Sequence, residues 1–158
     1  MDIQNSIILD IFKGISFSEY QLKIIESKFE KIILKKKDIL LKKGETVRYQ
    51  YYINSGCLRT CFLDNSEKEH TVQFAIKDWW ISDYTAFFTA SKAIMTIDCI
   101  QDAAIYRLSK KEMENLCREI PQLETFFRQK MEMAFASFQK RIIANLSQST
   151  KEKYISFI

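Results

Sequence analysis

The sequence predicts an α+β fold in which a double-stranded β-helix, or jelly-roll-like β-roll, follows short N-terminal helices and precedes a long C-terminal dimerisation helix. Three features of the 158-residue chain indicate this fold. Helical spacing of apolar residues ends near position 30, short apolar runs separated by turn residues fill positions 31–108, and helical spacing returns at Ser109. Because buried strand faces repeat every two residues and buried helix faces every three to four, these changes mark the boundaries between elements.

The first segment, residues 1–30, has the pattern of two short helices. Apolar residues at positions 7–12 have i, i+3, i+4 spacing, and Gly14 is placed to end that helix as a C′ glycine. Ser18 is followed three residues later by Gln21, which is the pattern of a capping box at the start of a second helix. We therefore expect two helices before the first strand.

Residues 31–108 are expected to form the β-roll. Short apolar runs are separated by charged or turn residues, and the clearest turn signals are Gly44-Glu45 and Asn54-Ser55-Gly56. Two closing strands are expected over residues 95–100 and 103–108. Strands at such short intervals favour a roll, barrel or sandwich.

One strand of the roll is expected from the alternation of apolar and polar residues over positions 69–76. Its more apolar side consists of His70, Val72, Phe74 and Ile76. Because alternate side chains of a strand point to opposite faces, we expect this side to be buried. The residues from Trp79 to Ser91 have no clear period and are expected to be irregular.

The segment of residues 109–147 is expected to contain a short helix and then a long one. Ser109 and Glu112 have the spacing of a capping box, and Pro121 suits the first position of a helix. No glycine or proline interrupts the chain from there to about Leu146. The second helix is therefore expected to be longer than most helices of globular proteins.

Apolar residues of this long helix have the alternating spacing of a coiled-coil seam. The seam consists of Phe127, Met131, Ala134, Phe138, Arg141 and Asn145. Further apolar residues lie off the seam at Phe126, Met133, Phe135 and Ile142. A helix that is apolar on so much of its circumference needs cover on more than one side. We therefore predict a symmetric homodimer through this helix, the alternative being a central helix buried within its own domain.

Composition and charge indicate a soluble cytoplasmic protein. The start of the chain has no secretion signal, and no apolar run is long enough to span a membrane, so no membrane partner is expected. Four cysteines in such a chain are expected to be reduced thiols. The net charge of +4 is mild, and the lysine runs Lys35–Lys37 and Lys42–Lys43 are interpreted either as exposed strand ends that resist edge pairing or as a basic patch.

The residue types that most catalysis and metal binding require are scarce. The chain has a single histidine, His70, and it contains no phosphate-binding loop, nucleophile elbow or Cys-x-x-Cys motif. Cys57 and Cys61 are too far apart along a straight strand to share a cluster. We therefore expect a protein that is not an enzyme and holds no metal or cofactor. A cupin-type metal-binding protein has a similar roll and is a further alternative, although cupins bind metal through several histidines.

Four segments carry a resemblance to a known family: Gly44-Glu45, Tyr51 to Arg59, Trp79 to Tyr84 and Ala104 to Ser109. In this order they resemble the early glycine turn, the strand–glycine–strand signature, the ligand segment and the last strand of the cyclic-nucleotide-binding sensor domain of Crp/Fnr transcription regulators. The Trp-Trp pair is similar to a variant common among Bacteroidetes regulators. The resemblance implies a regulatory homodimer and an effector of unknown identity.

The end of the chain, residues 148–158, resembles the first helix of the winged helix-turn-helix domain that usually follows this sensor domain. The remainder of that domain, with its recognition helix, would lie beyond Ile158. The resemblance therefore implies a truncated helix-turn-helix domain and contact with DNA only through a C-terminal domain absent from this chain.

The resemblance also implies a candidate ligand pocket, formed by Trp80, Ser82, Asp83, Tyr84, Lys92, Ala93 and Ile94. In members that bind cyclic AMP, a glycine, a glutamate, an arginine and a serine or threonine hold the ligand. The corresponding positions here are Ser82, Asp83, Ala93 and Ile94, and Lys92 is the only basic residue nearby. Because a buried phosphate without a charge partner is costly, tight binding of cyclic AMP is not expected.

Aromatic residues are concentrated in the same segment, at Trp79, Trp80, Tyr84, Phe87 and Phe88. Their rings are expected either to line an apolar pocket or to fill the roll. The predicted function is that of a sensor and dimerisation domain of a Crp/Fnr-type regulator. The alternative is a dimerisation module that binds no small molecule.

Overall fold

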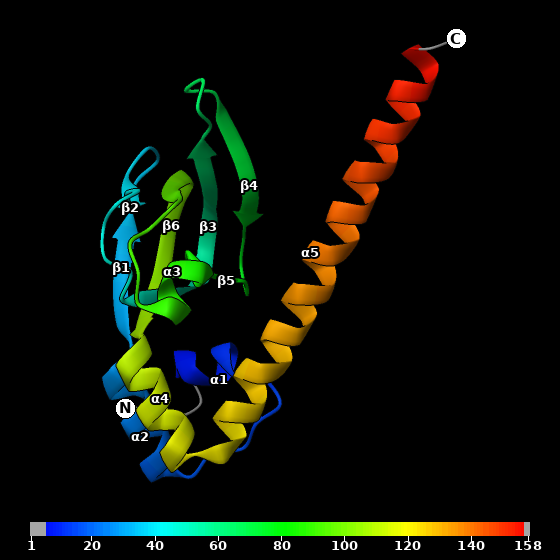
Figure 1. Cartoon of the computed structure of the whole chain (residues 1–158). Helices are drawn as coiled ribbons and strands as arrows, with labels where there is room; N and C mark the ends of the chain where they lie inside the picture. The colour runs from blue at the N-terminus through cyan, green and yellow to red at the C-terminus, as the bar shows by residue number, and fades with distance from the viewer. Residues whose placement is uncertain (1–5, 157–158) are drawn as a thin grey trace. The chain divides into compact units, whose positions relative to one another are not determined.

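A computed structural model of the chain describes the backbone of residues 6–156 and the side chains of residues 6–148. The chain divides into two compact units, Met1–Leu116 and Cys117–Ile158. Each unit is described by itself. The first unit contains the roll, and the second contains the end of one short helix and the whole of one long helix (Figure 1).

The order of elements confirms the predicted α+β class with a jelly-roll-like roll. The elements are α1 (Ile7–Ile11), α2 (Glu19–Lys28), β1 (Glu30–Leu34), β2 (Ile39–Leu41), β3 (Tyr49–Leu63), β4 (Glu69–Ala75), β5 (Trp80–Ile81), α3 (Tyr84–Thr89), β6 (Thr96–Ser109), α4 (Lys110–Glu119) and α5 (Pro121–Ser156). Helices α1, α2 and α4 lie at one end of the strands (Figure 1).

The sheet is built around its two long strands, β3 and β6. The hydrogen-bonded order is β1-β6-β3-β4, with β2 also paired to β6 and β5 to β3, and every pairing is antiparallel. The β3–β6 register runs from Tyr49↔Ser109 to Cys61↔Thr96. β1 and β4 therefore form the two ends of the pairing order.

The predicted turn at Asn54-Ser55-Gly56 is wrong, because these residues lie within the single strand β3. The β3–β6 register shifts there, so the segment is a bulge that bends one continuous strand. Gly56 has φ +90°, and a Cβ at this position would lie 2.4 Å from the carbonyl oxygen of Asp102. A glycine between two apolar runs thus marks a close approach of two strands here.

The break predicted between strands 95–100 and 103–108 is also wrong. β6 continues from Thr96 to Ser109, through Gln101 and Asp102, the two residues between the predicted strands. Opposite them, the bulge in β3 lets both long strands bend together without ending.

The predicted caps of the short helices are largely confirmed. The Ser18 side chain accepts from the Gln21 N–H at 3.1 Å, and the Gln21 side chain accepts from the Ser18 N–H at 3.0 Å, which completes the capping box of α2. Gly14 has the expected positive φ, +84°. However, α1 ends at a cap on Phe12, so Gly14 lies in the turn beyond the C′ position.

At the C-terminal end of β4 the buried face is opposite to the predicted one, although at its start His70 and Val72 are half-buried as expected. Phe74 and Ile76, expected inside, are 54% and 53% exposed, whereas Ala75 is fully buried and pairs with the core residue Leu58. At this position the core accepts a small side chain, and Phe74 lies opposite Arg59 on the other face. Hydrophobicity alone therefore assigned the wrong face to the last residues of this strand.

The core of the first unit is formed by residues of the strands, of α3 and of two connecting segments. It comprises Leu34, Leu41, Val47, Tyr51, Ile53, Leu58, Ala75, Ile81, Ala86, Phe87, Ala93, Ile97, Cys99, Ala103 and Ile105. The four cysteines are free thiols. Burial raises the pKa of Cys61 and of Cys99 above the ordinary thiol value, so these two groups stay protonated near neutral pH.

The helices after the roll begin where the sequence predicts. The Ser109 hydroxyl accepts from the Glu112 N–H at 3.1 Å, and Pro121 is the first residue of α5. α5 runs to Ser156, beyond the predicted end near Leu146. The helix-turn-helix assignment of residues 148–158 stays a prediction: its first part lies in the last turns of α5, and residues 157–158 lie outside the described residues. In the described part of the chain, no helix is long and apolar enough to cross a membrane.

Candidate functional site

The candidate pocket residues lie on the segment that joins β5 to β6 through α3. Asp83 is the N-cap of α3 and its side chain is fully buried. One carboxylate oxygen accepts from the Ala86 N–H at 3.3 Å, and the other accepts from the N–H groups of Ile94 and Met95 at 2.8 and 3.1 Å. The carboxylate therefore ties the start of α3 to the chain that enters β6.

Ser82, the residue at the glycine position of the family, is also buried and anchored. Its hydroxyl donates to the carbonyl oxygen of Tyr49 at 2.8 Å. The side chain thus links this segment to β3.

The position expected for a phosphate-binding arginine is occupied by a buried alanine. The Ala93 N–H donates to the Glu45 carbonyl oxygen at 2.8 Å, and the Ala93 carbonyl oxygen accepts from the Gly44 N–H at 2.8 Å. The neighbouring Lys92 is exposed, and its ammonium group donates to the Thr46 hydroxyl at 3.1 Å. The one nearby positive charge therefore lies at the surface, beside Thr46.

The two arginines on the paired strands β3 and β6 are held in ion pairs. Arg59 donates to both carboxylate oxygens of Asp98, at 3.1 and 2.6 Å, and lies 2.8 Å from Glu69. The hydrogen bond to Asp98 raises the pKa of Arg59 further above its ordinary value. Arg107 donates to Glu30 at 2.6 Å and packs over the ring of Tyr49. Neither guanidinium takes the place of the missing phosphate partner.

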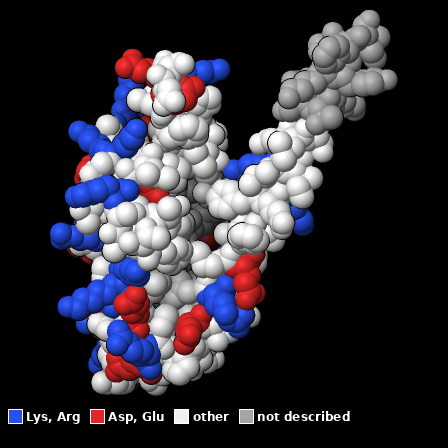
Figure 2. Space-filling view, in the orientation of Figure 1, with Lys and Arg blue, Asp and Glu red and all other residues white. Residues whose placement is uncertain are grey.

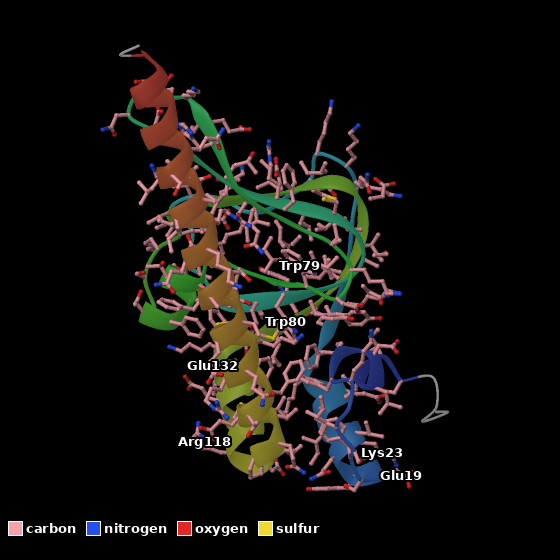
Figure 3. All side chains as sticks on the ribbon, turned by 90° about the vertical axis from the view of Figure 1, so that its right-hand side faces the viewer. Glu19, Lys23, Trp79, Trp80, Arg118 and Glu132 are labelled. Carbon is pink, nitrogen blue, oxygen red and sulfur yellow. The ribbon has the colours of Figure 1, made fainter. Side chains whose placement is uncertain are left out.

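The five aromatic residues of this segment do not form one cluster, because Trp80 packs apart from the rings of α3. The ring of Trp80 packs with those of Phe12, Phe29 and Tyr52, at centroid distances of 6.4, 6.2 and 5.7 Å, so Trp80 joins the roll to the N-terminal helices. Trp79 is 44% exposed (Figure 3).

The other three aromatic residues pack on one another within α3. Tyr84 stacks on Phe88 and meets Phe87 edge to face, with centroid distances of 5.4 and 5.9 Å. Phe87 is a core residue, whereas Phe88 is 44% exposed. Phe87 therefore fills the roll, which agrees with the second of the two expectations for these rings.

Polar contacts connect α3 with α4 at two places, and neither was predicted from the sequence. The Tyr84 hydroxyl donates to the side-chain oxygen of Gln50 at 3.0 Å, and the Gln50 amide nitrogen contacts the Met113 sulfur at 2.9 Å. At the other end of α3, the Lys110 ammonium group donates to the Phe88 carbonyl oxygen at 3.0 Å.

Burial raises the pKa of Tyr84 well above the ordinary phenol value, so its hydroxyl stays a donor at neutral pH. Gln50 is 1% exposed and is the one polar residue of the run Tyr49 to Ile53. A lone amide in a buried strand is the signal that sequence reasoning overlooked.

His70 lies at the β3–β4 hairpin and is paired, not packed in the core. Its Nε2 atom lies 2.7 Å from an Asp64 carboxylate oxygen, and its ring stacks on Phe62 at 5.1 Å. The hydrogen bond to His70 lowers the pKa of Asp64 below the ordinary carboxyl value. Among the described residues, no three His, Cys, Asp or Glu side chains gather closely enough to hold a metal ion.

The second unit presents apolar side chains to solvent along α5. The exposed large apolar residues are Met133, Phe135, Phe138, Ile142, Ile143 and Leu146. Among the predicted seam positions, Phe127 is buried, Met131 and Ala134 are half-buried, and Phe138, Arg141 and Asn145 are exposed. Arg141 packs over the ring of Phe138 at 5.4 Å, and Arg128 pairs with Glu132 one turn further on, at 2.6 Å.

Comparison with known proteins gives a family and several similar folds. Residues 31–120 match the family described as the cyclic nucleotide-binding domain. No curated protein matches the chain. Among solved structures, the sensor domain of the transcriptional regulator DNR from Pseudomonas aeruginosa is 18% identical, with a TM-score of 0.64 over 75% of this chain and 79% of that chain.

Two longer proteins are similar in fold as well. The catabolite activator protein of Thermus thermophilus is 13% identical, with a TM-score of 0.63 over 82% of this chain and 61% of that chain. The regulatory subunit of a cAMP-independent protein kinase A from Trypanosoma brucei is 14% identical, with a TM-score of 0.60 over 88% of this chain and 48% of that chain. This chain thus spans about half to three-fifths of these two proteins, and at such identities the likeness is one of fold.

Proposed function

The chain belongs to the family of cyclic nucleotide-binding domains, and from this premise we propose that it is the sensor and dimerisation domain of a Crp/Fnr-type transcription regulator that does not respond to cyclic AMP. In this proposal the protein is cytoplasmic, is not an enzyme, and contacts DNA through a further C-terminal domain of the helix-turn-helix kind. Family membership favours a sensor over a cupin-type metal-binding protein.

A single observation carries the cyclic AMP part of the proposal, namely that the polar groups of the α3 segment are bonded to one another. The Asp83 carboxylate accepts three backbone N–H groups, and both backbone groups of Ala93 pair with the turn at Gly44-Glu45. A ribose hydroxyl would have to displace bonds that already satisfy Asp83. A buried phosphate would find no guanidinium, and an unpaired buried charge costs several kcal/mol.

The contacts around Gln50 support a route by which the α3 segment acts on the helices that follow. Tyr84 and Phe88 lie at the two ends of α3, and each is joined to α4, through Gln50 and Lys110 respectively. A change in the position of α3 would therefore be carried to α4, and then along the chain to α5.

The exposed side of α5 supports the dimerisation part of the proposal. Met131, Phe135, Phe138, Ile142 and Leu146 follow one another at intervals of four and three residues, which aligns them on one side of a helix. This line shares Met131 and Phe138 with the predicted seam but passes through Phe135 and Ile142 instead of Ala134 and Arg141. Its large exposed side chains favour a second copy of the chain as its cover.

Isothermal titration with cyclic AMP tests the ligand part. We expect no saturable heat up to about 1 mM ligand, because each 1.4 kcal/mol of lost interaction weakens binding about tenfold. A low-micromolar Kd would overturn the proposal. The variant Lys92→Met then shows whether Lys92 supplies the missing charge: if so, it abolishes that affinity.

The same geometry favours a second candidate, a dimerisation module that binds no small molecule, because the α3 segment needs no ligand to satisfy its polar groups. A thermal-shift screen of nucleotides, haem, fatty acids and oxo-acids separates the two. A ligand at 100 times its Kd adds about 2.7 kcal/mol of stability, a readily visible shift. A screen without any shift would favour the second candidate.

A further inference from the structure

The excess positive charge of the chain is concentrated in one short segment. Residues 31–45 contain six lysines and two acidic residues, an excess of four, and the net charge of the whole chain is also +4. The remainder of the chain is therefore electrically balanced. Figure 2 shows blue side chains gathered along the edge of the first unit that β1 and β2 occupy.

Five of the six lysines lie on two turns, whose backbone is held by hydrogen bonds. Carboxylates beside these lysines accept those hydrogen bonds from backbone N–H groups. Asp38 accepts from the Lys35 N–H at 2.8 Å, and Glu45 accepts from the Lys42 N–H at 2.9 Å. Asp102 accepts from the N–H of the residue after Lys35, also at 2.8 Å.

The lysine side chains of these turns extend into solvent. The one ion pair among them, Lys35 with Asp102 at 3.9 Å, joins side chains that are 75% and 65% exposed, so it neutralises little. Within residues 6–148, no ion pair involves Lys36, Lys42 or Lys43. The turns thus hold uncompensated ammonium groups on an ordered backbone.

Protection of a sheet edge does not account for this arrangement. Charges that prevent edge pairing lie on the edge strand itself, and β1 is such a strand. Only Lys31 lies on it; the other five lysines occupy the turns. The strands instead expose apolar side chains, Ile33 at 60% and Ile39 at 51%, on either side of the turn Lys35–Lys37.

The side chains of this surface select among anionic partners. Residues 31–45 contain no arginine and no aromatic residue. Bidentate phosphate contacts use arginine, and stacking of bases uses aromatic rings, so nucleic acid lacks its usual contacts here. Ammonium groups beside exposed isoleucines suit a chain that alternates carboxylates with aliphatic side chains.

We propose that the turns Lys35–Lys37 and Lys42–Lys43, together with Ile33 and Ile39, form a docking surface for an acidic segment of another protein that also carries aliphatic side chains. The Lys42–Lys43 turn adjoins Gly44 and Glu45, whose backbone groups pair with Ala93 of the α3 segment. The rigid turns lower the entropy lost on binding, because only lysine side chains must be ordered.

Fluorescence anisotropy with a labelled peptide of glutamates interrupted by leucines tests the proposal at an ionic strength of about 0.15 M. The variant Lys36→Glu/Lys42→Glu/Lys43→Glu is expected to raise the Kd about tenfold or more. A matched control with the same change in net charge, Lys68→Glu/Lys77→Glu/Lys111→Glu, alters other exposed lysines and is expected to raise it less than about twofold. Circular dichroism melts verify that both variants fold.

A second peptide, in which serine replaces leucine, tests the apolar part of the surface. We expect weaker binding of this peptide, and we expect Ile33→Thr/Ile39→Thr to remove the difference between the two peptides. Equal losses in the two lysine variants would overturn the proposal, since net charge alone would then explain the binding. Tighter binding of duplex DNA, or of vesicles of phosphatidylserine and phosphatidylcholine, would overturn it in favour of those partners.

Discussion

The α3 segment and the helix α5 differ in whether their side chains find partners within the chain. In the first, buried polar groups are bonded within the same unit: Asp83 accepts three N–H groups, and Ser82 donates to β3. In the second, large apolar groups such as Phe135 and Ile142 are left 72% and 58% exposed. The difference is that the polar groups of the first segment have partners within their own unit, whereas the second leaves large apolar groups exposed, for which we propose a second copy of the chain as cover.

The largest effect should come from breaking the first unit at the bulge of β3. Gly56→Ala places a methyl group 2.4 Å from the Asp102 carbonyl oxygen in a backbone with φ +90°. We expect a loss of about 4 kcal/mol of unfolding free energy, near the upper end for single substitutions, measured by urea denaturation. Gly44→Ala is the matched control: φ is +92° but no atom lies within 4 Å, so the loss should be only about 1 kcal/mol. Equal losses would mean that the close approach of the strands is unimportant.

Removing the Asp83 carboxylate should have the next largest effect. Asp83→Ala leaves one buried and two part-buried N–H groups without their acceptor, and we expect a loss of about 3 kcal/mol. Asp83→Asn keeps one acceptor oxygen and should lose about half as much. Differential scanning calorimetry measures both. A change below about 0.5 kcal/mol for Asp83→Ala would contradict the claim that this carboxylate holds the segment together.

Substitutions on α5 should change association and leave the first unit stable. Phe135→Glu/Ile142→Glu puts charge into the proposed interface, and we expect the dimer Kd to rise about 100-fold, equivalent to about 2.7 kcal/mol. Ala134→Glu/Arg141→Glu marks the seam predicted from sequence spacing alone and should have the smaller effect. Sedimentation equilibrium compares the two, and a larger effect of the second pair would restore the original seam.

The smallest effect concerns pH. The hydrogen bond from Tyr52 holds the pKa of Asp78 below its ordinary value, at a distance of 2.5 Å. A carboxyl with a lowered folded-state pKa adds stability above its unfolded pKa of about 3.9, and this contribution is lost as the pH falls through the folded pKa. Asp78→Asn should therefore lower the stability near pH 7 and flatten its fall below about pH 4. An unchanged acid limb in calorimetric scans from neutral to acid pH would contradict the assignment.

The sequence predicted what periodicity and caps determine. The exchange of helix for strand near residues 30 and 109 and the capping box at Ser18 follow from local patterns, and the structure has both. The sequence-based prediction was wrong where tertiary packing determines which side chains are buried. The interior took Ala75 in place of Phe74 because it fits a small side chain opposite Leu58.

For the candidate site, the segment was identified from sequence but its bonding was not. Counting along the chain located Asp83 and Ala93, yet nothing local indicates that Asp83 meets the N–H groups of residues 94 and 95. The partners of Gln50 likewise lie 34 and 63 positions away in the chain. Such contacts arise only after β3 and β6 have brought distant residues together.

The oligomeric state in solution tests the central contrast most directly. Sedimentation velocity of the full chain at about 10 to 100 µM is predicted to give a single species of twice the 18.7 kDa chain mass, because in the proposed dimer a second copy covers the exposed side of α5. A species that stays at the mass of one chain throughout this range would contradict the account.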